Sequence, residues 1–484
     1  MIFMTGAHDR RPEFGKTCYG LFMHFTRRNV LGSACLTLLA SSVGAQEADG
    51  FFTLEARPGA TPLLAPPAPP TKIWGFGGLT PGPLLRVRLG QEMRVRLVNR
   101  LDQPTSLHWR GMRLPNAIDG AAGLVRKPLA PGETQDIRFV PPDAGTYFYQ
   151  PLIQPFSGEQ LGRGLYGAAI VDEPNPVAVD DDLVLLLDDW RLDASGQIVG
   201  DFEHPADALR QGRYGAVTGV NGRAGPASLI HPPGARLRLR LVNASNARIM
   251  RLAFEGGAQT VIALDGQFCD PFPPLHGTVP LGPGARCDML LDLPRQEGQG
   301  ARLILRGETE LPDAVVLDIA TRGAVRPAAP PVTHTPLNPL LPAEIRLQGA
   351  KRFELNFDGG WRKGMPAGFR PPAEELRRIW KINGRASSGL DGPPLFSVAR
   401  GSAVVLALVN KSLFDLSIFF QGHVVRLLHD LDDGWEPYWR DSVIVPERAT
   451  KHVAFIAGNR GKWLIGGAIQ EHFANGMAGW FEVA

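Results

Sequence analysis

The hydrophobic pattern of this chain alternates over short stretches that are separated by frequent turn residues. Three of these stretches share one spacing, in which a glycine and six further residues precede Leu-Val-Asn: Gly90–Asn99, Gly234–Asn243 and Gly401–Asn410. Inside them, apolar residues alternate with polar ones or β-branched residues follow one another, which is typical of a half-buried strand. Because the same spacing occurs three times, it predicts three copies of one β unit.

The ends of the first and third units also match. Gly145-Thr-Tyr and Gly461-Lys-Trp are each followed, eight residues after the glycine, by Ile-Gln. Acidic or proline-rich linkers at 172–182 and 326–342 separate the units. We therefore predict an all-β protein made of three tandem β-sandwich domains at residues 46–175, 183–325 and 343–484, with only short helical turns.

Composition narrows the class of protein. Of 484 residues, 44% are hydrophobic and 20% are charged, which excludes a disordered chain. The 56 glycines and 43 prolines disfavour long helices. The formal net charge of +3 comes from the first 45 residues, which hold five Lys or Arg and two Asp or Glu. The remaining chain is neutral overall, so we expect no nucleic-acid partner.

Residues 1–45 have the three parts of a twin-arginine (Tat) export signal. Arg27-Arg28 precedes a short apolar run at 30–40, and Val43-Gly44-Ala45 offers a small-residue cleavage site. Residues 1–22 do not resemble a signal n-region, which leaves Met23 as an alternative start of translation. The apolar run is too short to span a bilayer, and no later segment is long enough. We predict a periplasmic protein with no transmembrane segment in the mature chain.

Cleavage at this site would leave two cysteines, Cys269 and Cys287. In an oxidising periplasm they could form one disulfide. The alternative is two separate buried thiols, because Cys287 lies in a strand-like stretch. Two thiols cannot build a four-thiolate zinc site.

Four segments resemble the copper-ligand motifs of multicopper oxidases. Residues 106–120 (SLHWRGMRLPNAIDG) resemble a segment that usually reads L-H-W-H-G, and 145–152 (GTYFYQPL) resemble G-T-Y-W-Y-H-x-H. Residues 416–423 fall where the family has H-P-x-H-x-H-G-H, and 463–477 where it has W-x-x-H-C-H-x-x-x-H-x-x-x-x-M. The segment 434–441 (GWEPYWRD) is also similar to the family. The resemblance covers nearly all of residues 50–484 and implies three cupredoxin-like Greek-key domains.

In the family, a type 1 copper removes single electrons from a substrate and a trinuclear copper cluster reduces dioxygen to water. Type 1 copper needs a thiolate and two imidazoles, often with a weak axial methionine. The resemblance implies that this chain retains the family's ligand at three positions, His108, His472 and Met477. Other residues occupy the remaining ligand positions: Arg110, Gln150, Leu152, Leu416, Phe419, Gln421, Gly466, Gly467 and Ala468. We therefore expect no bound copper, no other cofactor and no catalytic residues.

The replacing side chains suggest that the former copper cavity is closed. Leu152 and Phe419 could fill it, while Arg110, Gln150 and Gln421 could bond to one another. If Arg110 is buried, it needs an acidic partner, for which Asp119 and Glu471 are candidates. His423, which matches a family histidine that is usually not a ligand, is expected to be structural.

Three functions follow from this interpretation. The first is an exported, copper-free member of the family that acts as a binding or scaffold module for a periplasmic or envelope protein; the family includes a copper-free, Tat-exported protein linked to cell division. The alternative is an oxidoreductase or copper-handling protein with a reduced, mononuclear site near His472 and Met477. A third option is a small-molecule binder that uses a pocket around Arg110.

Overall fold

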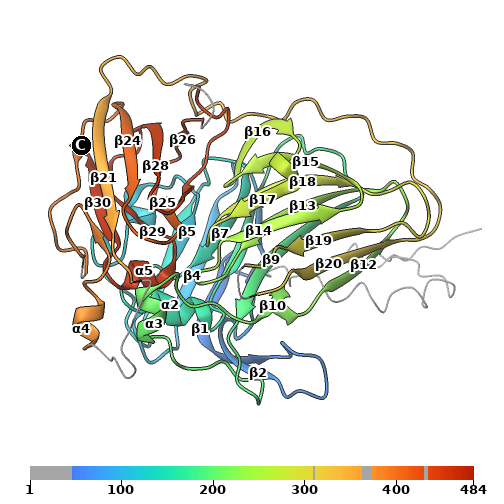
Figure 1. Ribbon diagram of the computed structural model, residues 1–484, viewed down its shortest axis with the longest axis horizontal. Coiled ribbons are helices and arrows are strands. Elements are labelled where there is room, and N and C mark those ends of the chain that lie inside the picture. The colour runs from blue at the N-terminus through green and yellow to red at the C-terminus, as the bar shows by residue number, and fades with distance from the viewer. Residues whose placement is uncertain (1–45, 309–310, 362–371, 388, 430–433) are drawn as a thin grey trace, which may run out of the picture.

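The computed structural model describes residues 46–308, 311–361, 372–387, 389–429 and 434–484. The predicted export signal and the possible start at Met23 lie outside these ranges, so they stay predictions. The described chain is mostly β and forms six sheets. The sheets pair into three sandwiches, as the repeat predicted. In Figure 1, domain 3 (orange to red) lies on the left, domain 2 (green) on the right, and domain 1 (blue to cyan) between them.

Domain 1 packs two four-stranded sheets against each other. Their orders are β2-β1-β4-β6 and β3-β8-β7-β5. The strands are β1 Phe52–Thr61, β2 Thr71–Phe76, β3 Leu85–Arg88, β4 Met93–Asn99, β5 His108–Arg110, β6 Thr134–Phe139, β7 Gly145–Gln150 and β8 Gly167–Asp172. Trp109, Tyr147 and Tyr149 are among the buried residues of its core.

Domain 2 has a seven-stranded sheet, β11-β10-β9-β13-β18-β15-β16, and a five-stranded sheet, β12-β20-β19-β14-β17. The strands are β9 Asp181–Trp190, β10 Val217–Val220, β11 Arg223–Ala224, β12 Ala227–His231, β13 Arg236–Asn243, β14 Met250–Glu255, β15 Ala258–Leu264, β16 Gln267–Phe272, β17 Thr278–Leu281, β18 Arg286–Asp292, β19 Ala301–Leu305 and β20 Ala314–Thr321.

Domain 3 packs two five-stranded sheets, β22-β21-β24-β28-β26 and β23-β30-β29-β25-β27. The strands are β21 Lys351–Asp358, β22 Lys381–Ile382, β23 Ser397–Val398, β24 Ala403–Asn410, β25 Leu416–Phe420, β26 Arg426–Leu427, β27 Ser442–Val445, β28 Thr450–Ile456, β29 Gly461–Gly467 and β30 Ala478–Val483.

The three repeated segments are the same strand of each domain. β4, β13 and β24 each pair in parallel with the first long strand of their domain (β1, β9 and β21) and antiparallel with a later one (β6, β18 and β28). The closing asparagines, Asn99, Asn243 and Asn410, are buried. Each donates its side-chain N–H groups to one backbone carbonyl in the loop that follows and to a second carbonyl much farther along the chain. The repeat therefore has a structural cause, because a buried amide fixes the turn that leaves the strand.

The helices are short and several meet between the domains. They are α1 Asn116–Asp119, α2 Ser157–Gly162, α3 Pro205–Leu209, the 3-10 turn η2 Leu275–Gly277, α4 Ala373–Leu376 and α5 Gln470–Ala474. α5 of domain 3 contacts α2 of domain 1 and α3 of domain 2, and the three lie together in the lower left part of Figure 1. Over the described ranges, no helix combines the length and the apolar character needed to cross a bilayer.

Cys269 and Cys287 are separate, buried thiols, so the structure does not contain the disulfide that was one of the two alternatives. They lie on β16 and β18, and β15 runs between these strands. Strands two places apart in a sheet are separated by about 9–10 Å, whereas the Cα atoms of a disulfide lie within about 7 Å. Burial raises the pKa of both thiols, which leaves them protonated and unreactive.

Candidate functional site

The structure brings the predicted ligand positions together in two strand pairs. In domain 1, β5 pairs with β7 so that His108 lies opposite Gln150. In domain 3, β25 pairs with β29 so that Phe419 lies opposite Gly466. The two pairs meet across the domain boundary, where the side-chain amide of Gln421 donates to the backbone carbonyl of Asp119 over 2.7 Å.

His108 is held by a carboxylate. Its Nδ1 lies 3.0 Å from both carboxylate oxygens of Asp119, and Asp119 also accepts a hydrogen bond from the backbone N–H of Trp109. The His108 side chain is buried, and its Nε2 has no hydrogen-bond partner. The cavity beside it has a volume of about 10 Å³, which is room for about one water molecule.

Arg110 is buried and pairs with an acid that the sequence analysis did not expect. The expected partners were Asp119 and Glu471, but the guanidinium Nε lies 3.5 Å from the carboxylate of Asp441. Asp119 is already engaged by His108, and Glu471 lies on α5. Burial lowers the pKa of Arg110, and the charge of Asp441 opposes this shift. The signal that could have found Asp441 is its place at the end of the family-like segment 434–441.

Asp441 belongs to a buried network of charges that joins all three domains. Arg286 of domain 2 donates two hydrogen bonds to its carboxylate, over 3.1 and 2.8 Å. Asp265, also of domain 2, accepts from the backbone N–H groups of Asp441 and Ser442, each over 3.0 Å. Arg110, Asp265, Arg286 and Asp441 are all buried, and two positive charges face two negative ones. Such a network is stable only when complete.

The apolar replacements pack together, as the sequence analysis expected. Leu152 from domain 1 lies in one cluster with Phe419, Ala468 and Phe473 from domain 3. The ring of Phe419 also lies against the guanidinium of Arg110, 4.5 Å from the ring centroid. The expected mutual bonding of the polar replacements is not present, since Gln421 bonds to the backbone of Asp119 and Leu464 instead. Arg110 is 2% exposed, which disfavours a small-molecule pocket around it.

His472 is a buried residue of α5, and Met477 follows the end of this helix. The imidazole of His472 stacks on Trp380 with ring centroids 3.7 Å apart, and its Nε2 lies 2.7 Å from the backbone carbonyl of Arg210. A nitrogen that faces a carbonyl must carry the proton, so the unpartnered Nδ1 keeps its lone pair. Burial lowers the pKa of His472 to about 3, and the hydrogen bond to Arg210 offsets part of that shift.

Gly467 lies between these two residues. A Cβ added to it would be 3.1 Å from the Met477 sulfur and 3.2 Å from the His472 Cβ. Leu416 and Met477 both belong to the apolar core of domain 3.

His423 is enclosed by Phe455, Trp463 and Phe481, which agrees with the structural role expected of it.

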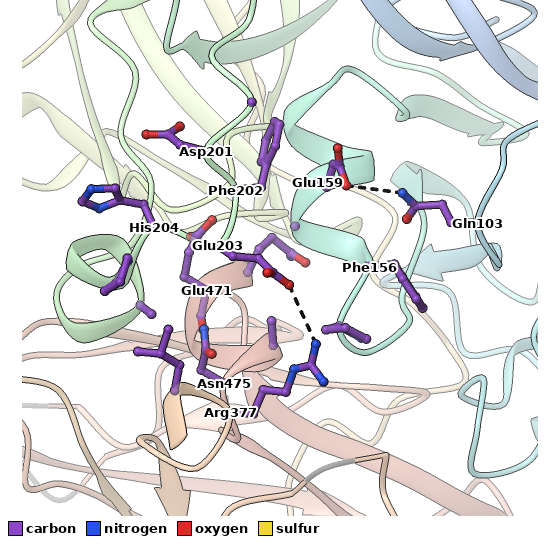
Figure 2. Close-up of a pocket in the computed structure, with 18 residues that line it drawn as sticks. Gln103, Phe156, Glu159, Asp201, Phe202, Glu203, His204, Arg377, Glu471 and Asn475 are labelled. Atoms are coloured by element: carbon purple, nitrogen blue, oxygen red, sulfur yellow. Dashed lines mark hydrogen bonds and ion pairs between the residues drawn. The ribbon is translucent and has the colours of Figure 1, made fainter. Parts of the chain in front are cut away.

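The sequence analysis missed an open cavity of about 610 Å³ between the domains. Figure 2 shows it lined by Glu159 of α2, Phe202 and Glu203 of domain 2, and Arg377 and Glu471 of domain 3. Its lining residues are scattered over the chain and no motif marks them, so only the three-dimensional arrangement reveals it.

The fold and these strand pairs define a three-domain cupredoxin protein, and comparison with known families agrees. Family models described as multicopper oxidase match residues 62–176, 181–301 and 367–484. The chain therefore belongs to the multicopper oxidase family.

Three relatives show how far the similarity extends. A multicopper oxidase structure from Pseudomonas thermotolerans is 30% identical, with a TM-score of 0.78 over 90% of this chain and 99% of that one. Multicopper oxidase MmcO of Mycobacterium tuberculosis is 27% identical over 434 residues, which is 83% of this chain and 81% of the relative. Cell division protein FtsP of Proteus mirabilis is 29% identical over 234 residues, covering 47% and 48% of the two chains.

The side chains at the positions predicted to correspond to the family's ligands are poor donors for copper. Gly466 and Gly467 offer no donor, Leu416 and Phe419 offer only hydrocarbon, and Arg110 brings a positive charge into the place of a ligand. Over the described ranges, no group of three or more His, Cys, Asp or Glu is arranged to hold a metal ion. We therefore derive no electron-transfer step through copper.

Proposed function

We propose that this chain is a copper-free member of the multicopper oxidase family that acts as a binding or scaffold module. The observation that carries the proposal is the filled ligand region. Leu152, Phe419 and Ala468 pack in one apolar cluster, and the adjacent Arg110 is paired with Asp441. Such packing supports a fold without a copper cluster, because apolar side chains and a paired arginine occupy the predicted ligand positions. FtsP, a relative named for cell division, is consistent with a role other than oxidation.

A second candidate function is copper handling or oxidation at a mononuclear site of His472 and Met477. Two observations favour it: the Nδ1 of His472 is free, and Met477 adjoins the same glycine. An imidazole and a thioether are soft enough to hold Cu(I). The relatives that match most of the chain are named as multicopper oxidases, which also favours this candidate.

Copper-dependent thermal stabilisation separates the two candidates, because a ligand that binds only the folded state raises its stability. Our proposal predicts the same melting temperature with and without excess Cu(I). If Cu(I) raises the melting temperature of the natural chain but not that of Met477→Leu, the second candidate is correct. Met250→Leu is the matched control, since Met250 is a buried methionine in the core of domain 2.

We further propose that the protein works in the periplasm, where it binds an envelope protein. The twin arginines at 27–28 support this location. Replacing both by lysine should retain the precursor in the cytoplasm, as fractionation and immunoblotting would show. Cross-linking in the periplasm should then enrich the same partner in repeated preparations, and enrichment that persists with the double-lysine variant would argue against a periplasmic partner.

A further inference from the structure

Strand β12 is an edge of the five-stranded sheet of domain 2 and pairs only with β20 in that sheet. Figure 1 shows it at the outer end of the sheet, beyond β20. Edge strands are usually protected from further pairing by charged residues or proline. The opposite edge strand, β17, contains Pro280, and β6, an edge strand of domain 1, carries Asp136 and Arg138. β12 reads ASLIH and has neither kind of protection.

The outward backbone groups of β12 belong to two residues. The carbonyl of His231 accepts a hydrogen bond from the backbone N–H of Arg322, over 3.0 Å, on the side of β20. Since backbone groups alternate in direction along a strand, those of Leu229 also face β20, and those of Ser228 and Ile230 face outward. Among the described residues, no hydrogen bond engages the outward N–H and C=O groups of Ser228 and Ile230.

A second copy of the same strand matches these groups by symmetry. Pro226 and Pro232 flank β12, so the segment that can pair is centred on Leu229. An antiparallel copy with Leu229 opposite Leu229 places Ser228 of each copy opposite Ile230 of the other. In this register every outward N–H meets an outward C=O. A two-fold axis at Ser228 or Ile230 would instead place a proline, which has no N–H, opposite one of the two residues.

The side chains allow this approach. β12 has no Lys, Arg, Asp or Glu, so two copies place no like charges opposite each other. Asp318, opposite Ser228 on β20, is already engaged by Arg302 over 3.1 Å. Ile230 is 50% exposed beside Ala320 of β20, and a second copy would cover part of this apolar surface.

From these observations we infer that β12 is a self-association edge, at which two copies of the chain join around a two-fold axis. The two five-stranded sheets then continue as one ten-stranded sheet. Two five-residue strands cover less surface than the about 1,200–2,000 Å² of a standard stable interface. The dimer is therefore reversible, with a Kd on the order of 1–100 μM. This inference goes beyond the proposed function, because it holds whether or not the chain binds copper.

The test is sedimentation velocity of the exported protein from about 1 to about 200 μM, which spans the expected Kd. The natural chain should shift from one to two chains per particle as its concentration rises. Ser228→Pro removes an outward N–H that has no partner in the single chain, so it should fold normally and stay monomeric. Ile230→Lys adds a charge to the edge and should weaken the dimer by about tenfold or more.

Leu275→Lys is the matched control for Ile230→Lys. Leu275 is 73% exposed and precedes β17, at the opposite edge of the sheet, so its replacement should leave the dimer unchanged. A natural chain that stays monomeric up to about 200 μM would leave this edge to a strand of another protein and overturn the inference. A dimer that persists unchanged in both β12 variants would overturn it as well.

Cysteine cross-linking tests the register. The Cα atoms of the two Leu229 residues would form a non-hydrogen-bonded pair about 4.5 Å apart, which is within the range of a disulfide. Leu229→Cys should therefore give a covalent dimer under mild oxidation. In Ile230→Cys the two cysteines would be offset along the strands, with Cα atoms more than about 7 Å apart, and should cross-link far less. The reverse order of cross-linking would contradict the two-fold axis at Leu229.

Discussion

Gly111 follows Arg110 at the junction of the domains and has no room for a side chain. Its φ is +87°, and an added Cβ would lie 1.8 Å from the Arg286 guanidinium and 2.7 Å from the Asp441 carboxylate. The sequence analysis identified the segment that contains this glycine, but it could not show why a glycine is required. That reason lies in residues of domains 2 and 3 that are far away in the sequence.

Gly111→Ala should therefore destabilise the protein by roughly 2–4 kcal/mol, because left-handed strain is added to the displacement of a buried ion pair. Differential scanning calorimetry should show a clearly lower melting temperature. Gly132→Ala is the control, since Gly132 has a similar φ of +81° but nothing within 4 Å of an added Cβ. Equal losses of stability in the two variants would mean that backbone strain alone, and not the displaced ion pair, explains the effect at position 111.

His423 should make the protein sensitive to acid. Burial lowers its pKa to about 4, whereas the unfolded imidazole titrates near 6.5. Between these values the unfolded chain binds a proton that the folded chain excludes, so the free energy of unfolding falls as the pH falls from about 6.5 to about 4. The slope from this one residue is on the order of 1 kcal/mol per pH unit.

His423→Phe retains the aromatic contacts and removes the titrating group, so its melting temperature should fall less steeply over this pH window. His334→Phe, at an exposed position, should keep the slope of the natural chain. Thermal melts at half-unit pH steps check this, and parallel slopes for the natural chain and His423→Phe would contradict the expectation.

At the scale of elements, the strands that carry the predicted ligand positions pair in regular register. β25 and β29 remain in register, with Phe419 opposite Gly466, and α5 follows β29. The sequence predicted the repeated strands β4, β13 and β24 well, because their alternation and their closing asparagine depend on local structure. It did not predict the two-residue strands β11, β22, β23 and β26, whose pairing depends on neighbours distant in the chain.

Restoring donors to these strands should restore a copper site. Leu416→His together with Gly467→Cys would add an imidazole and a thiolate to His472 and Met477, completing the type 1 set. We expect the double variant to gain the thiolate absorption of blue copper and about one copper per chain. Gly467→Cys alone should gain neither, since its second imidazole is missing. A double variant that folds but binds no copper would show that the strands, and not only the donors, have changed.

At the scale of the whole molecule, buried charges hold the three domains together. Arg110 comes from domain 1, Asp265 and Arg286 from domain 2, and Asp441 from domain 3. The repeat predicted three domains, but Asp119 and Glu471, the candidate partners for a buried Arg110, are not its partners. Contacts between domains depend on how complete domains pack, and no local pattern encodes them. The open cavity was missed for the same reason.

Asp441→Asn should leave two buried arginines without their shared partner and cost about 3–5 kcal/mol. Since the lost contacts join domains, calorimetry should show a lower melting temperature and a broader transition. Asp318→Asn is the control, because Asp318 pairs with Arg302 at the surface, where 48% and 55% of the side chains are exposed; it should change the stability by less than about 1 kcal/mol. An Asp441→Asn protein as stable as the control would contradict the role of these buried charges in holding the domains together.

The measurement that tests the central claim most directly is the copper content of the exported protein, by mass spectrometry after purification from copper-fed cells. It should be combined with assays for oxidation of phenols and of cuprous ion. Our account predicts copper well below one atom per chain and no oxidase activity. One copper per chain that is lost in Met477→Leu would instead establish the mononuclear site. Three or four copper atoms with oxidase activity would contradict the assignment of the ligand positions.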